Sequence, residues 1–245
     1  RLRTASERAA FQLRLSDALR PLTDPLEAQR VATALLQTQL AADRVFYAEV
    51  EPDLQHVIIA LDEGQLEPRI VGRHLMSTFG PTLVAELHAG RTLAIEDFEI
   101  DARLEPRDHL AHQACGVRAT FAQPLMKRGR LVGTLVAQSV ATRVWTPEEE
   151  LLITDTTERL WEALERARTD ATLRTSEARL REILDRLPLQ IWLSSASGEV
   201  QYLNKHWYDY GGTSPTKATA ARVAEEAVHP DDVPGLMAAF ARAMS

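Results

Sequence analysis

The chain of 245 residues is long enough for one large domain or two ordinary ones, and its 45% hydrophobic fraction excludes global disorder. Its 35 acidic and 28 basic residues give a formal net charge of -7, which argues against a general nucleic-acid binder with a basic face. No apolar run approaches the roughly 20 residues that cross a bilayer, and no signal-peptide pattern is present. We therefore expect a cytoplasmic protein without a membrane span, cut from a longer one because the chain starts at Arg1 and not at Met.

Two helices are predicted before the first strand. A helical stripe of Phe11, Leu15, Ala18 and Leu22 marks an N-terminal helix within residues 1–22. The segment Asp24-Pro25-Leu26-Glu27 has the composition of a helix start, and it opens a second helix. Residues 44–50 and 54–61 are then rich in β-branched and aromatic residues on either side of Pro52-Asp53, which indicates an antiparallel hairpin.

Short elements alternate in the middle of the chain. Short helices are predicted at residues 81–88 and 105–114, with a short strand at 92–95 between them. Residues 117–125 and 131–138 form the clearest hairpin, joined by Lys127-Arg128-Gly129-Arg130. Helices and strands segregate in this way in α+β folds, so we expect a central antiparallel sheet flanked by helices and not a doubly wound parallel sheet.

A long coiled-coil helix is predicted over residues 146–187. It starts with a capping box at Thr146-Pro147-Glu148-Glu149, and no glycine or further proline follows before Pro188. Its apolar residues form two stripes that do not share one heptad register, so we expect a phase shift near residues 171–173. Each thin stripe needs a partner helix, and we expect a homodimer, parallel or antiparallel; the alternative is an amphipathic helix packed on its own domain. The residues assigned to the dimer helix are Leu160, Leu164, Ala167, Ala171, Leu180, Leu184 and Leu187.

Several motifs occur in an order that resembles a GAF domain over residues 13–168. They are residues 90–97 (GRTLAIED), 115–119 (CGVRA), 123–125 (QPL), 129–133 (GRLVG) and 145–149 (WTPEE). The resemblance implies a sensory fold whose central antiparallel sheet has helices on both sides, with a cavity between the sheet and the short helices. By the same resemblance, the cavity residues are Phe46, Phe79, His109, His112, Phe121 and Gln123. The alternative is that these side chains only fill the core.

Residues 176–245 resemble the N-terminal half of a PAS domain, a second sensory fold. The matching residues are Leu184, Leu187-Pro188, Ile191-Trp192, residues 198–204 (GEVQYLN), Trp207 and residues 229–232 (HPDD). The last three strands of a PAS sheet are missing from the chain. Because two strands leave an open edge and an uncovered apolar face, we expect this truncated half to be partly ordered or to pair with another copy.

Motifs that would indicate catalysis are not found. The sequence has no Gly-rich phosphate loop, no nucleophile elbow and no His-Glu-x-x-His, so we expect no enzymatic activity in this chain. His109 and His112 are three residues apart with Asp108 nearby, but two histidines are too few for a closed site, and no metal is predicted. Cys115 is the only cysteine, and it is a poor match to the bilin-linking position of phytochrome-like GAF domains. Free methionine sulfoxide reductases share the fold but need several cysteines.

These resemblances imply a non-catalytic sensory and dimerisation region of a bacterial signal-transduction protein. The GAF domain would relay its ligand or partner state through the helical linker to a downstream histidine kinase, diguanylate cyclase or other output domain. No cofactor is predicted, although an unidentified small-molecule ligand fits this interpretation. The alternatives are a bilin- or haem-binding photoreceptor or gas sensor, and a ligand-free structural GAF spacer.

Overall fold

The computed structural model describes residues 2–64, 66–195, 200–211 and 229–243. The chain divides into two compact units, residues 1–171 and 172–245. Gly198 and Glu199, which belong to the PAS-like motif, lie outside the described residues. Among the helices of the described ranges, none is both long and apolar enough to cross a membrane.

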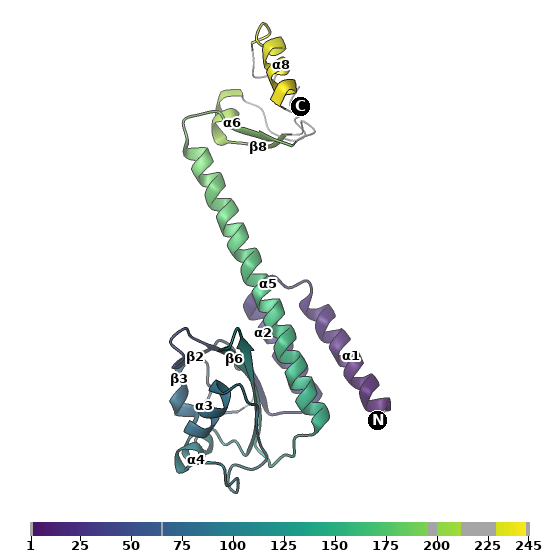
Figure 1. The fold of residues 1–245 in the computed structure, drawn as a ribbon, viewed down its shortest axis with the longest axis vertical. Helices are drawn as coiled ribbons and strands as arrows, with labels where there is room; N and C mark the ends of the chain where they lie inside the picture. Colours follow the sequence, from purple (N-terminus) through teal and green to yellow (C-terminus); the bar gives the residue numbers. More distant parts are fainter. Residues whose placement is uncertain (1, 65, 196–199, 212–228, 244–245) are drawn as a thin grey trace. The chain divides into compact units, whose positions relative to one another are not determined.

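A six-stranded antiparallel sheet forms the centre of the first unit (Figure 1). Its strands are ordered β3-β2-β1-β6-β5-β4. Their bounds are β1 (Arg44–Val50), β2 (His56–Ile59), β3 (Gly72–Leu75), β4 (Leu93–Ile95), β5 (Ala119–Lys127) and β6 (Arg130–Ser139). Both predicted hairpins are confirmed, as β1 pairs with β2 and β5 with β6. Strand β3 was not predicted, because its sequence GRHL is mostly polar and does not alternate.

The turn between β5 and β6 follows from its sequence. Lys127 pairs with Arg130, which leaves Arg128 and Gly129 as a two-residue loop. Their φ angles are 52° and 76°, and two successive positive φ values are what a type I′ hairpin turn requires. Glycine at the second position adopts this conformation at little cost.

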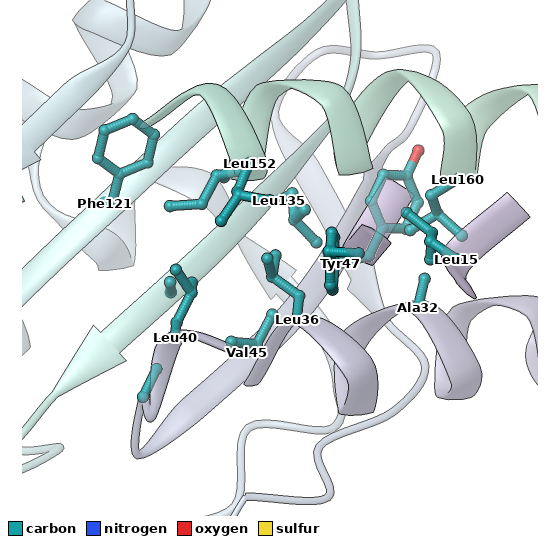
Figure 2. Close-up of a cluster of buried hydrophobic side chains, with 14 of the residues drawn as sticks. Leu15, Ala32, Leu36, Leu40, Val45, Tyr47, Phe121, Leu135, Leu152 and Leu160 are labelled. Atoms are coloured by element: carbon teal, nitrogen blue, oxygen red, sulfur yellow. The ribbon is translucent and has the colours of Figure 1, made fainter. Parts of the chain in front are cut away.

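Three helices cover one face of the sheet: α1 (Leu2–Leu19), α2 (Pro25–Leu40) and the part of α5 (Pro147–Arg186) that belongs to the first unit. Asp24 caps α2 by accepting a hydrogen bond from the Leu26 amide at 3.1 Å. The predicted capping box of α5 is confirmed, since Thr146 and Glu149 each accept from the other's backbone amide, at 3.3 and 3.0 Å. Figure 2 shows the buried layer that these helices and the sheet share, including Leu15, Ala32, Leu36, Tyr47, Leu135 and Leu160.

A second buried cluster lies on the opposite face, under η1 (Met76–Phe79), α3 (Pro81–His88) and α4 (Pro106–Gln113). Successive side chains of a strand point to opposite faces, so each strand of the sheet serves both clusters. In β1, Val45 and Tyr47 belong to the cluster under α1, α2 and α5, whereas Phe46 and Ala48 belong to the cluster under α3.

The second unit contains the end of α5, a β7 (Trp192–Ser194) and β8 (Val200–Leu203) antiparallel pair, α6 (Lys205–Gly211) and α8 (Val233–Ala243). Asn204 holds its beginning together, because the side-chain amide donates to the carbonyl oxygens of Leu184 at 2.9 Å and Leu189 at 2.7 Å. The PAS resemblance of this unit stays a prediction.

The predicted dimer stripe needs a correction in its first half. Leu160, Leu164 and Ala167 are fully buried in their own chain, and the two leucines belong to the core cluster with α1, α2 and the sheet. They are therefore not accessible to a second helix. By contrast, the leucine and isoleucine residues of α5 beyond residue 171 are partly or largely exposed, and Leu173 and Leu180 are each 57% exposed. This change from buried to exposed side chains falls near residues 171–173, where the phase shift was expected. The first stripe is buried because it faces the core of the first unit.

Candidate functional site

A small cavity lies between the sheet and α3. It is lined mainly by apolar side chains of β1, β2, η1, α3 and β6, with His112 of α4 and Thr120 of β5. Its volume is about 30 Å³. A buried water needs roughly 10 to 15 Å³ by this measure, whereas ligand pockets of proteins have about 300 to 1,000 Å³. In this conformation the cavity is therefore the size of one or two waters, and a larger ligand requires the walls to move.

Four polar side chains line this apolar cavity: His112, Thr120, Thr134 and Gln138. The Thr134 hydroxyl donates to the carbonyl oxygen of Gln123 at 3.0 Å, and Gln138 Oε1 accepts from Arg44 Nη1 at 3.4 Å. The Thr120 hydroxyl is buried and has no hydrogen-bond partner among the described residues. Because an unpaired buried hydroxyl is costly, Thr120 is the group that a water or a ligand atom in the cavity would satisfy.

His112 is a neutral member of the cavity wall. Its ring stacks on Phe98 with a centroid distance of 3.7 Å, and it bonds to the backbone of Phe79. Burial lowers the pKa of His112 to about 4, against the opposing effects of Asp108 and of the bond to Phe79. The neutral ring can donate one hydrogen bond and accept one, and it adds no charge to the cavity at neutral pH.

Asp108 fixes the two helices that close the cavity. Its carboxylate accepts from the Thr82 amide at 3.1 Å, the Thr82 hydroxyl at 2.6 Å and the Glu105 amide at 2.8 Å. The first two bonds hold the start of α3, and the third completes the capping box of α4. Gly80 is needed beside this carboxylate, because a Cβ at position 80 would lie 2.1 Å from Asp108 Oδ1. Asp108 thus has a structural role and is not a metal ligand candidate with His109 and His112.

The six predicted pocket residues do not come together in one cavity. Phe46, Phe79 and His112 line it, while His109 is half-buried outside its lining. Phe121 packs on Trp145 under α5, and Gln123 accepts from the hydroxyls of Thr92 and Thr154 at 2.8 and 3.1 Å. Placing Phe121 and Gln123 with the others was wrong, because odd-numbered positions of β5 face α5. The prediction missed Thr120, Thr134 and Gln138. They could have been found from their even-numbered positions on β5 and β6, because even-numbered residues in this part of the two strands face α3.

The other face of β1 contacts α5 where that helix leaves the sheet. Tyr47 is buried there, and Glu49 forms an ion pair with Arg168 of α5. The Arg168 guanidinium lies 5.9 Å from the ring centroid of Trp161 and also pairs with Glu165 at 3.2 Å. Phe46 and Ala48, which alternate with these residues, line the cavity. One strand therefore touches the cavity on one side and α5 on the other.

One cluster of potential metal ligands occurs among the described residues, at the β1–β2 turn. The ligand atoms of Glu51, Asp53 and His56 lie within 4.8 Å of one another. These groups already have partners, because Glu51 pairs with Arg73 at 2.7 Å and Asp53 with His56 at 2.6 Å. The cluster therefore gives no argument for a metal.

The sequence profile of the GAF domain matches residues 24–164, which is more than half of the chain. The chain belongs to the GAF domain family. The matched range contains the whole sheet, the cavity and the helices that close it. Sequence comparison with curated proteins finds no match.

Solved structures with this fold include proteins with different functions. A free methionine-R-sulfoxide reductase from Neisseria meningitidis is 18% identical, with a TM-score of 0.53 over 67% of this chain and 93% of the reductase. The chromophore-binding domain of a bacteriophytochrome from R. palustris is 14% identical, with a TM-score of 0.57 over 68% of this chain and 64% of that domain. The GAF domain of an Acinetobacter phosphoenolpyruvate-protein phosphotransferase is 13% identical, with a TM-score of 0.54 over 68% of this chain and 98% of that domain. Identities this low support the GAF fold alone.

Proposed function

We propose that this chain is the non-catalytic sensory and dimerisation region of a cytoplasmic bacterial signal-transduction protein. In this proposal the GAF domain responds to a small molecule or partner, and α5 passes its state through a PAS-like unit to an output domain such as a histidine kinase. The observation that carries the proposal is the double contact of β1, with Phe46 and Ala48 on the cavity and Glu49 on Arg168 of α5. We assign no catalytic step to this chain.

A ligand in this cavity would act on the strand that also contacts α5. A ligand larger than one or two waters has to displace the cavity walls, which include β1, η1 and α3. Protein interiors are close-packed, so a displaced strand also disturbs the side chains on its opposite face. On β1 these are Tyr47 and Glu49, which contact the cluster under α5 and the Arg168 side chain. A ligand acts in this way only if it binds the displaced packing more tightly than the closed one.

The proposal is tested by screening metabolites for a rise in melting temperature, followed by native mass spectrometry of the hits. A ligand that binds only the folded state raises the stability in proportion to the logarithm of its concentration. The variant Ala48→Val adds two carbons at the cavity wall and should abolish the response. The control Ala94→Val makes the same change on β4, away from the cavity, and should keep it. A response that survives Ala48→Val would place the binding site elsewhere.

A ligand-free structural GAF domain is the second candidate. The volume of about 30 Å³ favours it, as do the existing hydrogen bonds of Thr134 and His112. This candidate predicts no retained small molecule and no shift of the melting temperature with any compound.

A further inference from the structure

An exposed apolar seam runs along the last four turns of α5 and ends at Leu187, the first residue after the helix. Leu173, Leu180, Ile183 and Leu187 are 57%, 57%, 49% and 37% exposed, and Ser176 is exposed between them. The five residues follow one another at steps of three, four, three and four. This is the a/d spacing of two heptads, with leucine at each a position and Ser176 and Ile183 at d. All five lie in the second unit and beyond the residues that match the GAF profile.

The second unit itself covers the opposite side of this helix. Asp185, at position f, accepts from the Tyr202 hydroxyl at 2.9 Å and from the Lys205 amide at 2.8 Å. The Leu184 carbonyl oxygen accepts from Asn204, and the Leu184 side chain is partly buried. Because position f is opposite the a/d seam, these contacts orient the seam away from β8 and α6. The seam is therefore a face that the described part of its own unit leaves open.

We propose that Leu173, Ser176, Leu180, Ile183 and Leu187 form a parallel, in-register contact with the same residues of a second copy of this chain. The proposal rests on the dimer in the proposed function and gives it a location and an orientation. It keeps Leu180 and Leu187 of the predicted stripe, and it has Leu173 and Ile183 in place of Ala171 and Leu184. An a/d seam two residues wide fits another helix of the same spacing, and the second copy supplies one.

The flanking charges select the parallel arrangement. The g positions of the seam are Thr172, Arg179 and Arg186, and the e positions are Glu177 and Leu184. In an antiparallel pair, g positions face g positions, so Arg179 and Arg186 of one helix would lie against the same arginines of the other. In a parallel pair, g faces e, so Arg179 lies opposite Leu184 and Thr172 opposite Glu177. The parallel pair brings no like charges together, and e and g charges are known to set orientation.

The same flanks limit the contact to two helices. Leucine at a and isoleucine at d favour higher oligomers in parallel coiled coils, but those oligomers also bury the e and g positions. Glu177, Arg179 and Arg186 would then lose their hydration, and the burial of charged groups is costly. Ser176 adds one polar residue at d, which costs stability and fixes register.

Cysteine cross-linking of the full chain tests the orientation. Cys115 is first replaced by alanine, because it is the only native cysteine. Ser176→Cys in this background places the same thiol on both helices of a parallel seam, so oxidation should give a disulfide-linked dimer. The matched control Ala178→Cys, two residues away at position f, should stay monomeric on a non-reducing gel. Leu180→Glu should raise the dissociation constant measured by sedimentation about tenfold or more.

The outcomes separate this proposal from the proposed function. If Ser176→Cys does not cross-link, but a mixture of Leu173→Cys and Ile183→Cys chains does, the contact is antiparallel and only the orientation is overturned, because an antiparallel pair places a positions opposite d positions. If Ala178→Cys cross-links and Ser176→Cys does not, the dimer stands and the seam is wrong. If the native chain sediments as a monomer, both the seam and the dimerisation part of the proposed function fail, while ligand binding by the GAF domain is still tested by the melting-temperature screen.

Discussion

Gly133 of β6 leaves space for the hydroxyl of Tyr47 on β1: a Cβ at position 133 would lie 2.2 Å from Tyr47 Oη. Figure 2 shows Tyr47 within the buried layer under α5, close to Leu160. The hydroxyl has no hydrogen-bond partner among the described residues, and burial raises the pKa of Tyr47 well above its usual value. The pair therefore combines a close contact with an unpaired polar atom.

Gly133→Ala should lower the free energy of unfolding by about 1 to 3 kcal/mol, because the new methyl group overpacks the side chain of Tyr47. Tyr47→Phe should change it by less than about 1 kcal/mol or raise it, because the variant loses no hydrogen bond. Urea denaturation followed by circular dichroism measures both. A larger loss for Tyr47→Phe would mean that the hydroxyl has a partner, such as a bound water.

His112 should make stability depend on pH. Burial lowers its pKa from 6.5 to about 4, so between these values the unfolded chain binds a proton that the folded chain does not. The contribution of neutral His112 to the free energy of unfolding is fully present above about pH 6.5, and it is lost as the pH falls towards 4. The total loss is about 3 kcal/mol, at 1.36 kcal/mol for each unit of pKa.

The measurement is the free energy of unfolding of the native chain and of His112→Gln at pH 7, 6 and 5. The native chain should lose more stability over this range than the variant does, because glutamine does not titrate. Equal losses in the two proteins would show that the imidazole is already protonated in the fold, or that it is not buried.

Arg44 and Asp62 form an ion pair with no solvent exposure, with Nε 3.2 Å from Oδ1. Arg44 Nη2 also donates to the carbonyl oxygens of Leu66 and Pro68, and Asp62 accepts from the Ile70 amide. Asp62→Ala should lower the free energy of unfolding by about 3 to 5 kcal/mol, because it leaves a buried guanidinium without its counter-charge. The double variant Arg44→Met with Asp62→Leu should recover part of this loss in chemical denaturation. If the double variant is the least stable, the guanidinium bonds to the loop carbonyls matter more than the charge pair.

Gly80 and Gly116 form a matched pair for testing the contact at the start of α3. Both have positive φ angles, of 106° and 64°, but a Cβ at position 116 meets no atom within 4 Å. Gly116→Ala should lower the free energy of unfolding by about 1 to 2 kcal/mol, because alanine is less stable than glycine in a left-handed backbone conformation. Gly80→Ala should lower the free energy of unfolding by more than that, because its φ and ψ of 106° and 142° are nearly restricted to glycine and because the new methyl group displaces Asp108. Thermal unfolding compares them, and equal shifts would indicate that Asp108 moves aside freely.

The elements with strong local signals were predicted well. The caps at Asp24 and Thr146 and the turn at Arg128-Gly129 depend on residues next to each other in sequence, so local reasoning finds them. Strand β3 was missed because it is held by pairing with β2 and carries little apolar pattern of its own.

The site was harder to predict because it depends on which face of the sheet a residue joins. Phe121 and Thr120 are neighbours in sequence, yet Phe121 packs under α5 and Thr120 lines the cavity. Two layers of helices cover the sheet, so both faces of β5 are apolar and alternation does not mark the cavity side. In α5, Leu160 and Leu173 both belong to apolar stripes, and only the position of the sheet decides that Leu160 is buried in its own chain while Leu173 is exposed.

The alternation of side chains along β1 also limits how that strand can move. A slip of one residue along β6 would exchange Phe46 with Tyr47 and turn Glu49 towards the apolar cavity. Such a slip would bury a carboxylate in an apolar cavity, so this strand cannot slide by one residue without a large loss of stability. Tilting or bowing of β1 perpendicular to the sheet keeps every pair in place, and it is the one displacement of this strand that a filled cavity can drive without breaking the ladder.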